Sequence, residues 1–125
     1  MANNVTELLM APRQCRRTDL VEIAGHYDIT VNDRVCEITL PGSGGWAVSL
    51  PPVAEVVGEF VGIHIVADSG TGYATVSVNA ADSPSENILG FGVQTFVGSF
   101  TLDDLDEYVI LYSTGAHWLT LTWNK

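Results

Sequence analysis

Acidic side chains form the densest group of potential metal ligands in the sequence. Asp103, Asp104, Asp106 and Glu107 lie within one short stretch. Calcium binds where several carboxylate oxygens converge, but this spacing is not that of an EF-hand loop. Asp103 and Asp104 are also suited to cap a helical turn that precedes a strand. We expect the capping role and no metal, with a calcium site shared between subunits as the alternative.

Groups that could serve in catalysis are present, but they stand in no arrangement typical of an enzyme. His26, His64 and His117 belong to no nucleophile motif, and we expect His64 and His117 to be packing, surface or interface residues. The segment Gly42-Ser-Gly-Gly45 lacks the context of a nucleophilic serine and the lysine of a phosphate-binding loop. A glycosidase needs two carboxylates across a cleft, which a sequence cannot show. We therefore predict that the protein is not an enzyme and has no cofactor.

Aromatic rings offer another kind of chemistry, the stacking of sugars on a flat surface. The rings that could form such a platform are Trp46, Trp118, Trp123, Tyr108 and Tyr112. Packing in the core or between subunits is the commoner use of such rings. The run from Glu107 to Ser113 has apolar residues on both faces, and one small domain cannot easily bury both sets. We therefore expect a subunit interface, with Tyr108, Tyr112 and Trp118 as candidate residues.

Length and charge limit the classes of function. The chain has 125 residues, 46% of them hydrophobic, which predicts one folded domain. The net charge of −10 disfavours binding to nucleic acid or to anionic membranes. No apolar run approaches the roughly 20 residues of a membrane-spanning helix, and the N-terminus lacks the pattern of a secretory signal. We expect no nucleic-acid partner, no membrane association and synthesis in the cytoplasm.

The start of the chain differs from the rest because it holds the one basic cluster, formed by Arg13, Arg16 and Arg17. This cluster is either a solvated segment or part of an arm that docks on an acidic partner. Cys15 and Cys36 are too few for a disulfide framework, so we expect reduced thiols. A bridge between them would instead tie the arm to an early strand.

Short alternating runs separated by turn residues predict the elements that position these groups. The clearest strands are Phe60 to Ala67 and Tyr73 to Ala80, in which apolar residues recur with a period of two. Val21 to Ala24 could form a short strand, and Asn32-Asp33 suits a two-residue turn. About eight to nine such strands with almost no helix are typical of a sandwich or barrel.

The end of the chain predicts a β-hairpin around Thr114-Gly115-Ala116, with Leu119, Leu121 and Trp123 on one face of its second strand. The predicted fold is therefore all-β, an antiparallel β-sandwich or a small, jelly-roll-like barrel. The predicted organisation is an extended N-terminal arm, residues 1–20, followed by a single β domain, residues 21–125.

Four passages between Ile38 and Trp123 resemble, in order, a family of small β-rich virion proteins of tailed bacteriophages, especially marine ones. They cover about two-thirds of the chain. The passages are Ile38-Thr-Leu-Pro with Trp46-Ala-Val-Ser-Leu-Pro-Pro-Val-Ala-Glu55, Gly58-Glu-Phe-Val-Gly-Ile-His-Ile-Val-Ala-Asp68, Gly70-Thr-Gly-Tyr-Ala-Thr-Val-Ser-Val78, and Phe100-Thr-Leu-Asp-Asp with Tyr108-Val-Ile-Leu-Tyr-Ser-Thr-Gly-Ala-His-Trp118.

The resemblance implies a capsid decoration (head-stabilising) protein, or the β domain of a head fibre or tail component. Such proteins are commonly trimers on the capsid surface of the virion, with the major capsid protein as partner, and they carry no catalytic residues. An N-terminal arm often contacts the shell in decoration proteins, so Arg13, Arg16 and Arg17 are candidate capsid contacts. The alternative is a carbohydrate- or receptor-binding module of a fibre or tail that uses exposed Trp and Tyr.

Overall fold

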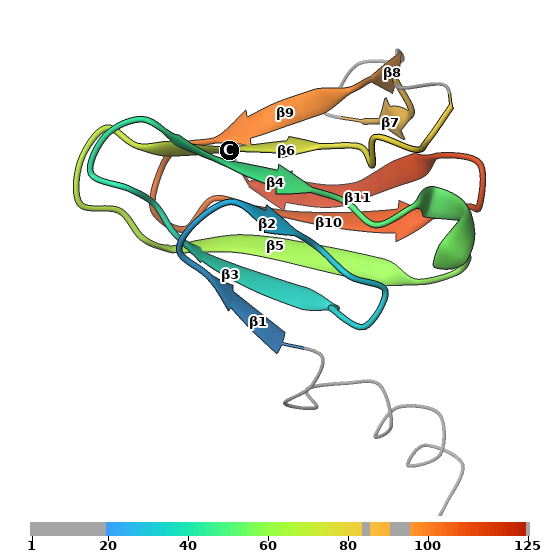
Figure 1. Cartoon of the computed structure of the whole chain (residues 1–125), viewed down its shortest axis with the longest axis horizontal. Coiled ribbons are helices and arrows are strands. Elements are labelled where there is room, and N and C mark those ends of the chain that lie inside the picture. The colour runs from blue at the N-terminus through green and yellow to red at the C-terminus, as the bar shows by residue number, and fades with distance from the viewer. Residues whose placement is uncertain (1–19, 84–85, 91–95, 125) are drawn as a thin grey trace, which may run out of the picture.

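Two β-sheets pack face to face in the computed structural model of the chain, which describes residues 20–83, 86–90 and 96–124 (Figure 1). The larger sheet has the strand order β1-β3-β5-β10-β11-β7-β8, and the smaller has the order β2-β4-β6-β9. The strands are β1 (Leu20–Ile23), β2 (Tyr27–Asp28), β3 (Val35–Thr39), β4 (Gly45–Ser49), β5 (Phe60–Ala67), β6 (Tyr73–Ser77), β7 (Ile88–Leu89), β8 (Phe96–Val97), β9 (Ser99–Leu102), β10 (Tyr108–Ser113) and β11 (Trp118–Asn124). The predicted all-β sandwich is confirmed.

Helix is almost absent from the described residues. A short 3-10 helix, η2 (Val53–Glu55), follows β4. None of the helices in this part of the chain has the length and apolar character needed to cross a membrane. The predicted N-terminal arm, apart from its last residue Leu20 at the start of β1, lies outside the described residues.

Many neighbouring strands run parallel, which differs from the antiparallel arrangement that we predicted. Parallel pairs join β1 to β3 and β3 to β5 in the larger sheet, and β2 to β4 and β4 to β6 in the smaller one. The chain alternates between the two sheets from β1 to β6, so strands two apart in sequence become neighbours with the same direction. Antiparallel pairs such as β5 with β10 and β6 with β9 make both sheets mixed.

A turn at Val31-Asn32 connects the two sheets. The backbone N–H of Asp33 donates to the carbonyl oxygen of Thr30 at 3.1 Å, which closes the turn. The Asp33 carboxylate also accepts hydrogen bonds from the Tyr27 hydroxyl at 2.8 Å and from the Thr30 N–H at 2.8 Å. The predicted turn at Asn32-Asp33 is therefore one residue too late, and the observed turn joins β2 of the smaller sheet to β3 of the larger one.

The C-terminal hairpin of β10 and β11 is confirmed, with Gly115 at φ 94° in its turn. Its register shifts once: Ile110 pairs with Thr122, whereas Leu111 pairs with Thr120. The shift leaves Leu121 as an extra residue, and such a bulge changes which side of the sheet the later side chains face. The prediction that Leu119, Leu121 and Trp123 share one face is therefore wrong, because strict alternation stops at Leu121.

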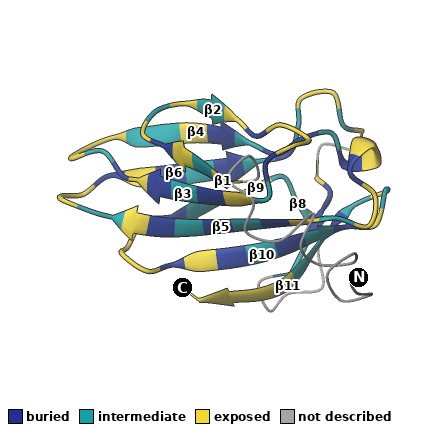
Figure 2. Cartoon of the chain, turned by 90° about the horizontal axis from the view of Figure 1, so that it is seen from below, coloured by how far each residue is buried: buried dark blue, intermediate teal, exposed yellow. Residues whose placement is uncertain are grey.

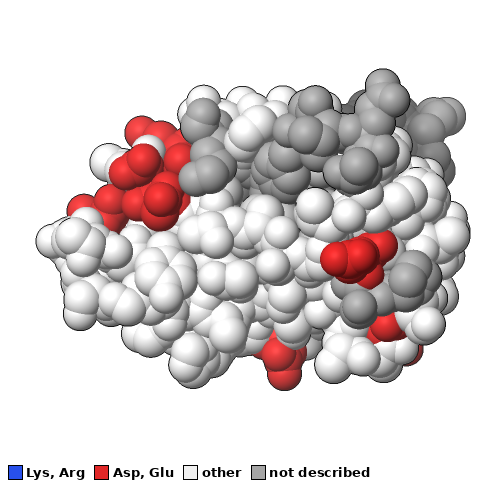
Figure 3. Space-filling view, turned by 90° about the horizontal axis from the view of Figure 1, so that it is seen from above, with Lys and Arg blue, Asp and Glu red and all other residues white. Residues whose placement is uncertain are grey.

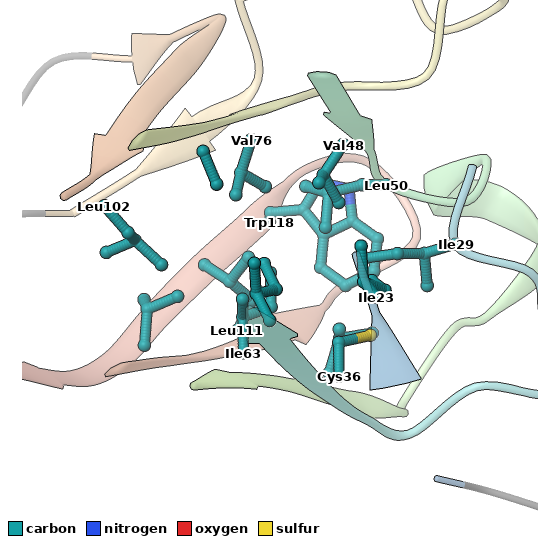
Figure 4. Close-up of a cluster of buried hydrophobic side chains, with 14 of the residues drawn as sticks. Ile23, Ile29, Cys36, Val48, Leu50, Ile63, Val76, Leu102, Leu111 and Trp118 are labelled. Carbon is teal, nitrogen blue, oxygen red and sulfur yellow. The ribbon is translucent and has the colours of Figure 1, made fainter. Parts of the chain in front are cut away.

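The core fills the space between the sheets, and Trp118 is its largest fully buried side chain (Figure 4). Inward-facing aliphatic residues of β5 and β10 alternate with less buried ones along both strands (Figure 2). Full burial of such a side chain contributes about 1.5–3 kcal/mol. The residues labelled around Trp118 come from both sheets and their connections: Ile23, Ile29, Cys36, Val48, Leu50, Ile63, Val76, Leu102 and Leu111.

Candidate functional site

The outward side of the larger sheet carries exposed apolar side chains instead of the usual polar ones. Gly62 of β5 pairs with Val35 of β3 on one side and with Ile110 of β10 on the other. In the next row, Phe60 pairs with Tyr112, and their ring centroids are 5.2 Å apart. We call this surface the outer face and define it by Val35, Phe60, Gly62, His64, Tyr108, Ile110, Tyr112 and Leu121.

The middle of the outer face is hollowed. One hollow of about 720 Å³ is lined by Val35, Phe60, Gly62, Ile110 and Leu121, among others. A second hollow of about 550 Å³ shares Val35, Gly62 and Ile110 with the first. The two hollows therefore adjoin beside Gly62, and we call them together the Gly62 groove.

Charged side chains surround the Gly62 groove. Arg34 is the one Lys or Arg among the described residues, and it forms an ion pair with Glu59 at the edge of the first hollow. His64 Nε2 lies 3.3 Å from Asp106 Oδ1 beside the second hollow. Glu22 of β1 pairs with Glu37 of β3 in the row that also contains His64. The surroundings of the groove are therefore rich in carboxylates.

Acidic side chains also dominate elsewhere on the surface. Figure 3 shows them gathered in separate patches, with no Lys or Arg of the described residues in view. Because Arg34 is already paired with Glu59, the described surface is suited to a cationic or apolar partner.

Two of the three predicted interface residues lie on the outer face. Tyr108 and Tyr112 of β10 point outward, while Val109 and Leu111 between them are buried. Trp118 is 0% exposed within a single copy of the chain. Its prediction as an interface residue is wrong, because β11 directs this ring into the core. The predicted capsid contacts Arg13, Arg16 and Arg17 lie outside the described residues.

The acidic stretch before β10 forms a turn organised by Glu107. The buried Glu107 side chain accepts the backbone N–H groups of Asp103 at 2.7 Å and Asp104 at 3.2 Å through Oε1. Glu107 therefore supplies a capping carboxylate that the sequence did not predict. Carboxylate oxygens of Asp103, Asp104 and Glu107 lie within 4.8 Å of one another, so the alternative of a calcium site would fall in this turn.

The histidines bond to structural partners. His26 Nδ1 accepts the N–H of Ala47 at 2.8 Å, which links the segment before β2 to β4. His117 Nδ1 lies 3.4 Å from Thr114 Oγ1, within the turn of the C-terminal hairpin. With His64 beside Asp106, each of the three described histidines has a contact that positions an element of the fold.

Cys36 is a free, fully buried thiol that points into the core (Figure 4). Burial, with a smaller contribution from Asp33, raises the pKa of Cys36 from 9.0 to about 12. The thiol therefore stays protonated at neutral pH, and thiolate is the reactive form. Cys15, the other half of the alternative disulfide, lies outside the described residues.

The Gly62 groove was not predicted from the sequence. The signal that could have found it is the glycine in the middle of the apolar run Phe60 to Ala67. Comparisons of the chain with family models, with curated proteins and with solved structures find no match in any of the three.

Proposed function

We propose that the protein is a structural virion protein, a decoration protein that binds the outside of a tailed-phage head and stabilises it. The major capsid protein is its partner, and the working form is a small oligomer, with a trimer as the first candidate. The observation that carries the proposal is the outer face, which exposes aromatic and aliphatic side chains over several strands. The choice of a virion protein rests on the four passages between Ile38 and Trp123 that resemble such proteins.

The outer face has the composition of a protein contact. Phe60 is 49% exposed, Tyr108 is 37% exposed, and the Tyr112 ring packs against the Phe60 ring. Aromatic residues are enriched at the centres of protein interfaces, where a few of them supply most of the binding energy. The same surface would be costly to leave in water on a protein that acts alone.

Such a protein would stabilise a shell because each copy buries surface area and many copies bind to equivalent sites. A protein that bridges neighbouring shell subunits adds buried surface, and about 1,600 Å² in total is enough for specific binding. Attachment to many equivalent sites multiplies the effect on the shell. Arg13, Arg16 and Arg17 would contribute contacts to the shell, and the acidic body would keep particles dispersed.

Size-exclusion chromatography with light scattering, followed by binding to undecorated capsids, tests the proposal. We expect a mass near three times 13.4 kDa and saturable binding to capsids. A Tyr108→Ser and Tyr112→Ser double variant should lose the oligomer. A matched control, Tyr73→Ser, removes a tyrosine that is 41% exposed on β6 of the smaller sheet and should keep it. A monomer that binds no capsid would overturn the proposal.

A carbohydrate- or receptor-binding module is the second candidate, because the Gly62 groove has Phe60 and Tyr108 at its walls. Exposed rings beside a concave surface suit sugar stacking. Binding of the monomer to immobilised glycans, and its loss in Phe60→Ala, would favour this candidate over a purely structural role.

A further inference from the structure

Gly62 occupies the middle of a central strand although the fold does not require a glycine there. A Cβ added at Gly62 would meet no heavy atom closer than the Arg34 carbonyl oxygen, at 3.9 Å. By contrast, a Cβ at Gly70 or Gly72 would collide with the backbone of the segment after β3. Glycine inside a strand weakens it, and often marks the place where a ligand or another backbone approaches closely. The open space above Gly62 therefore points to an occupant.

The charges around the groove limit what that occupant can be. Glu22, Glu37 and Asp106 lie beside it, and the one described cation, Arg34, is paired with Glu59. Two outer faces packed against each other about a two-fold axis would bring the same carboxylates together at the groove, which is unfavourable. A segment with apolar and cationic residues matches both the groove and its surroundings.

The chain itself carries such a segment before β1. Residues 1–19 contain three arginines, Arg13, Arg16 and Arg17, against two acids, Glu7 and Asp19. Leu8, Leu9 and Met10 form an apolar stretch just before the arginines. Apart from Arg34 and the C-terminal Lys125, these arginines are all the Lys and Arg of the sequence.

The point where this segment joins the body lies beside the groove. Leu20, the first described residue, pairs with Val35, which lines both hollows. Neighbouring strands are about 4.8 Å apart, so the β5 strand at Gly62 is about 10 Å from β1. An extended chain covers about 3.3 Å per residue, so a few residues are enough to reach it.

We propose that residues 1–19 lie across the outer face of their own chain in the free protein, with Leu8, Leu9 and Met10 in the Gly62 groove. Arg13, Arg16 and Arg17 then lie along the acidic row of Glu22 and Glu37. The segment fills the hollow and leaves the rings of Tyr108 and Tyr112 at its margin available to a partner. The proposal concerns the isolated protein and does not depend on capsid binding.

Limited digestion of the full-length protein with trypsin tests this arrangement, because the enzyme cleaves after Arg and Lys. Three of its sites lie in the segment, and Arg34, the site in the described body, is held in an ion pair. Gly62→Leu fills the groove at a position with room for a side chain. The control is Thr75→Leu, which places the same side chain outward on β6, the central strand of the smaller sheet.

We expect cleavage after Arg13, Arg16 and Arg17 to be about tenfold faster in Gly62→Leu than in the wild type, because cleavage follows the population of the undocked segment. Thr75→Leu should digest like the wild type. A Glu22→Gln and Glu37→Gln double variant should also be cleaved faster than the wild type. It changes only outward side chains, so it tests the proposal even if Gly62→Leu fails to fold.

Two outcomes would overturn the proposal. Equal cleavage rates in the wild type and in both groove-side variants would mean that the segment does not dock on the outer face. Protection that increases with protein concentration would mean that the segment of another copy occupies the groove.

Discussion

The Ser113 hydroxyl donates a buried hydrogen bond of 2.6 Å to the carbonyl oxygen of Val53, a residue sixty positions earlier in the chain. Val53 begins the short 3-10 helix η2, which carries the chain from β4 of the smaller sheet to β5 of the larger one. Ser113 is the last residue of β10. The Ser113 side chain thus holds η2, which connects the two sheets, against β10 at the centre of the outer face.

Ser113→Ala should lower the free energy of unfolding by about 1–3 kcal/mol, because the buried Val53 carbonyl loses its short side-chain partner. Urea denaturation measures the change. Ser99→Ala is the matched control, since Ser99 is exposed on β9, and it should stay within about 0.5 kcal/mol of the wild type. A similar small change in both variants would show that this hydrogen bond does not contribute to stability.

Tyr27 should make the fold sensitive to alkali. Burial, together with the hydrogen bond to Asp33, raises the pKa of Tyr27 from 10.0 to about 12. The folded state therefore holds this proton more tightly than the unfolded state does. The resulting stabilisation is fully present below pH 10 and is lost as the pH rises to about 12.

Thermal unfolding of the wild type and of Tyr27→Phe between pH 8 and pH 12.5 tests this expectation. The difference in stability between the two proteins should be constant below about pH 10 and shrink above it. A difference that stays constant up to pH 12 would contradict the raised pKa.

Cys36 should be unreactive in the folded protein, since its thiol is fully buried and its pKa is raised to about 12. In a Cys15→Ser variant, which leaves Cys36 as the one thiol, a thiol-specific reagent at pH 8 should react only after unfolding in urea. Fast labelling of the native variant would show that the core around Cys36 opens more readily than its burial suggests.

Glu107 should be the acidic residue on which the turn before β10 depends. Glu107→Ala removes the oxygen that accepts the N–H groups of Asp103 and Asp104, and should cost about 1–3 kcal/mol. Glu107→Gln keeps an oxygen in that place and should cost clearly less. Asp104→Ala, which changes an exposed carboxylate, should have little effect on urea denaturation. Equal costs for Glu107→Gln and Glu107→Ala would mean that the charge of Glu107, and not its hydrogen bonds, holds the turn.

Elements with a strong local signal were predicted well. The run from Phe60 to Ala67 forms β5 with the predicted bounds, because alternation within one strand depends only on which side faces the core. The C-terminal hairpin was predicted for a similar reason, since Gly115 adopts the positive φ that such a turn favours.

Strand pairing could not be predicted in the same way. A half-buried strand alternates identically whether its neighbour is parallel or antiparallel, so the turn at Val31-Asn32 does not reveal that it links two sheets. The bulge at Leu121 also leaves no local trace, and it makes Leu119 pair with the outward Tyr112 but Trp123 pair with the buried Val109. The Gly62 groove depends on Val35 and Ile110, which the sequence separates from Gly62 by many residues.

The alternation of β1 to β6 between the sheets has a consequence for how the chain reaches its native state. No two consecutive strands from β1 to β6 pair with each other. No part of this stretch can therefore form a stable local unit before strands of the same sheet have come together. The longest pairing between consecutive strands is that of β10 with β11, at the very end of the chain. Since local pairings form fastest, we expect folding to start at the hairpin of β10 and β11. The alternating stretch would then assemble on this hairpin, through the pairing of β5 with β10.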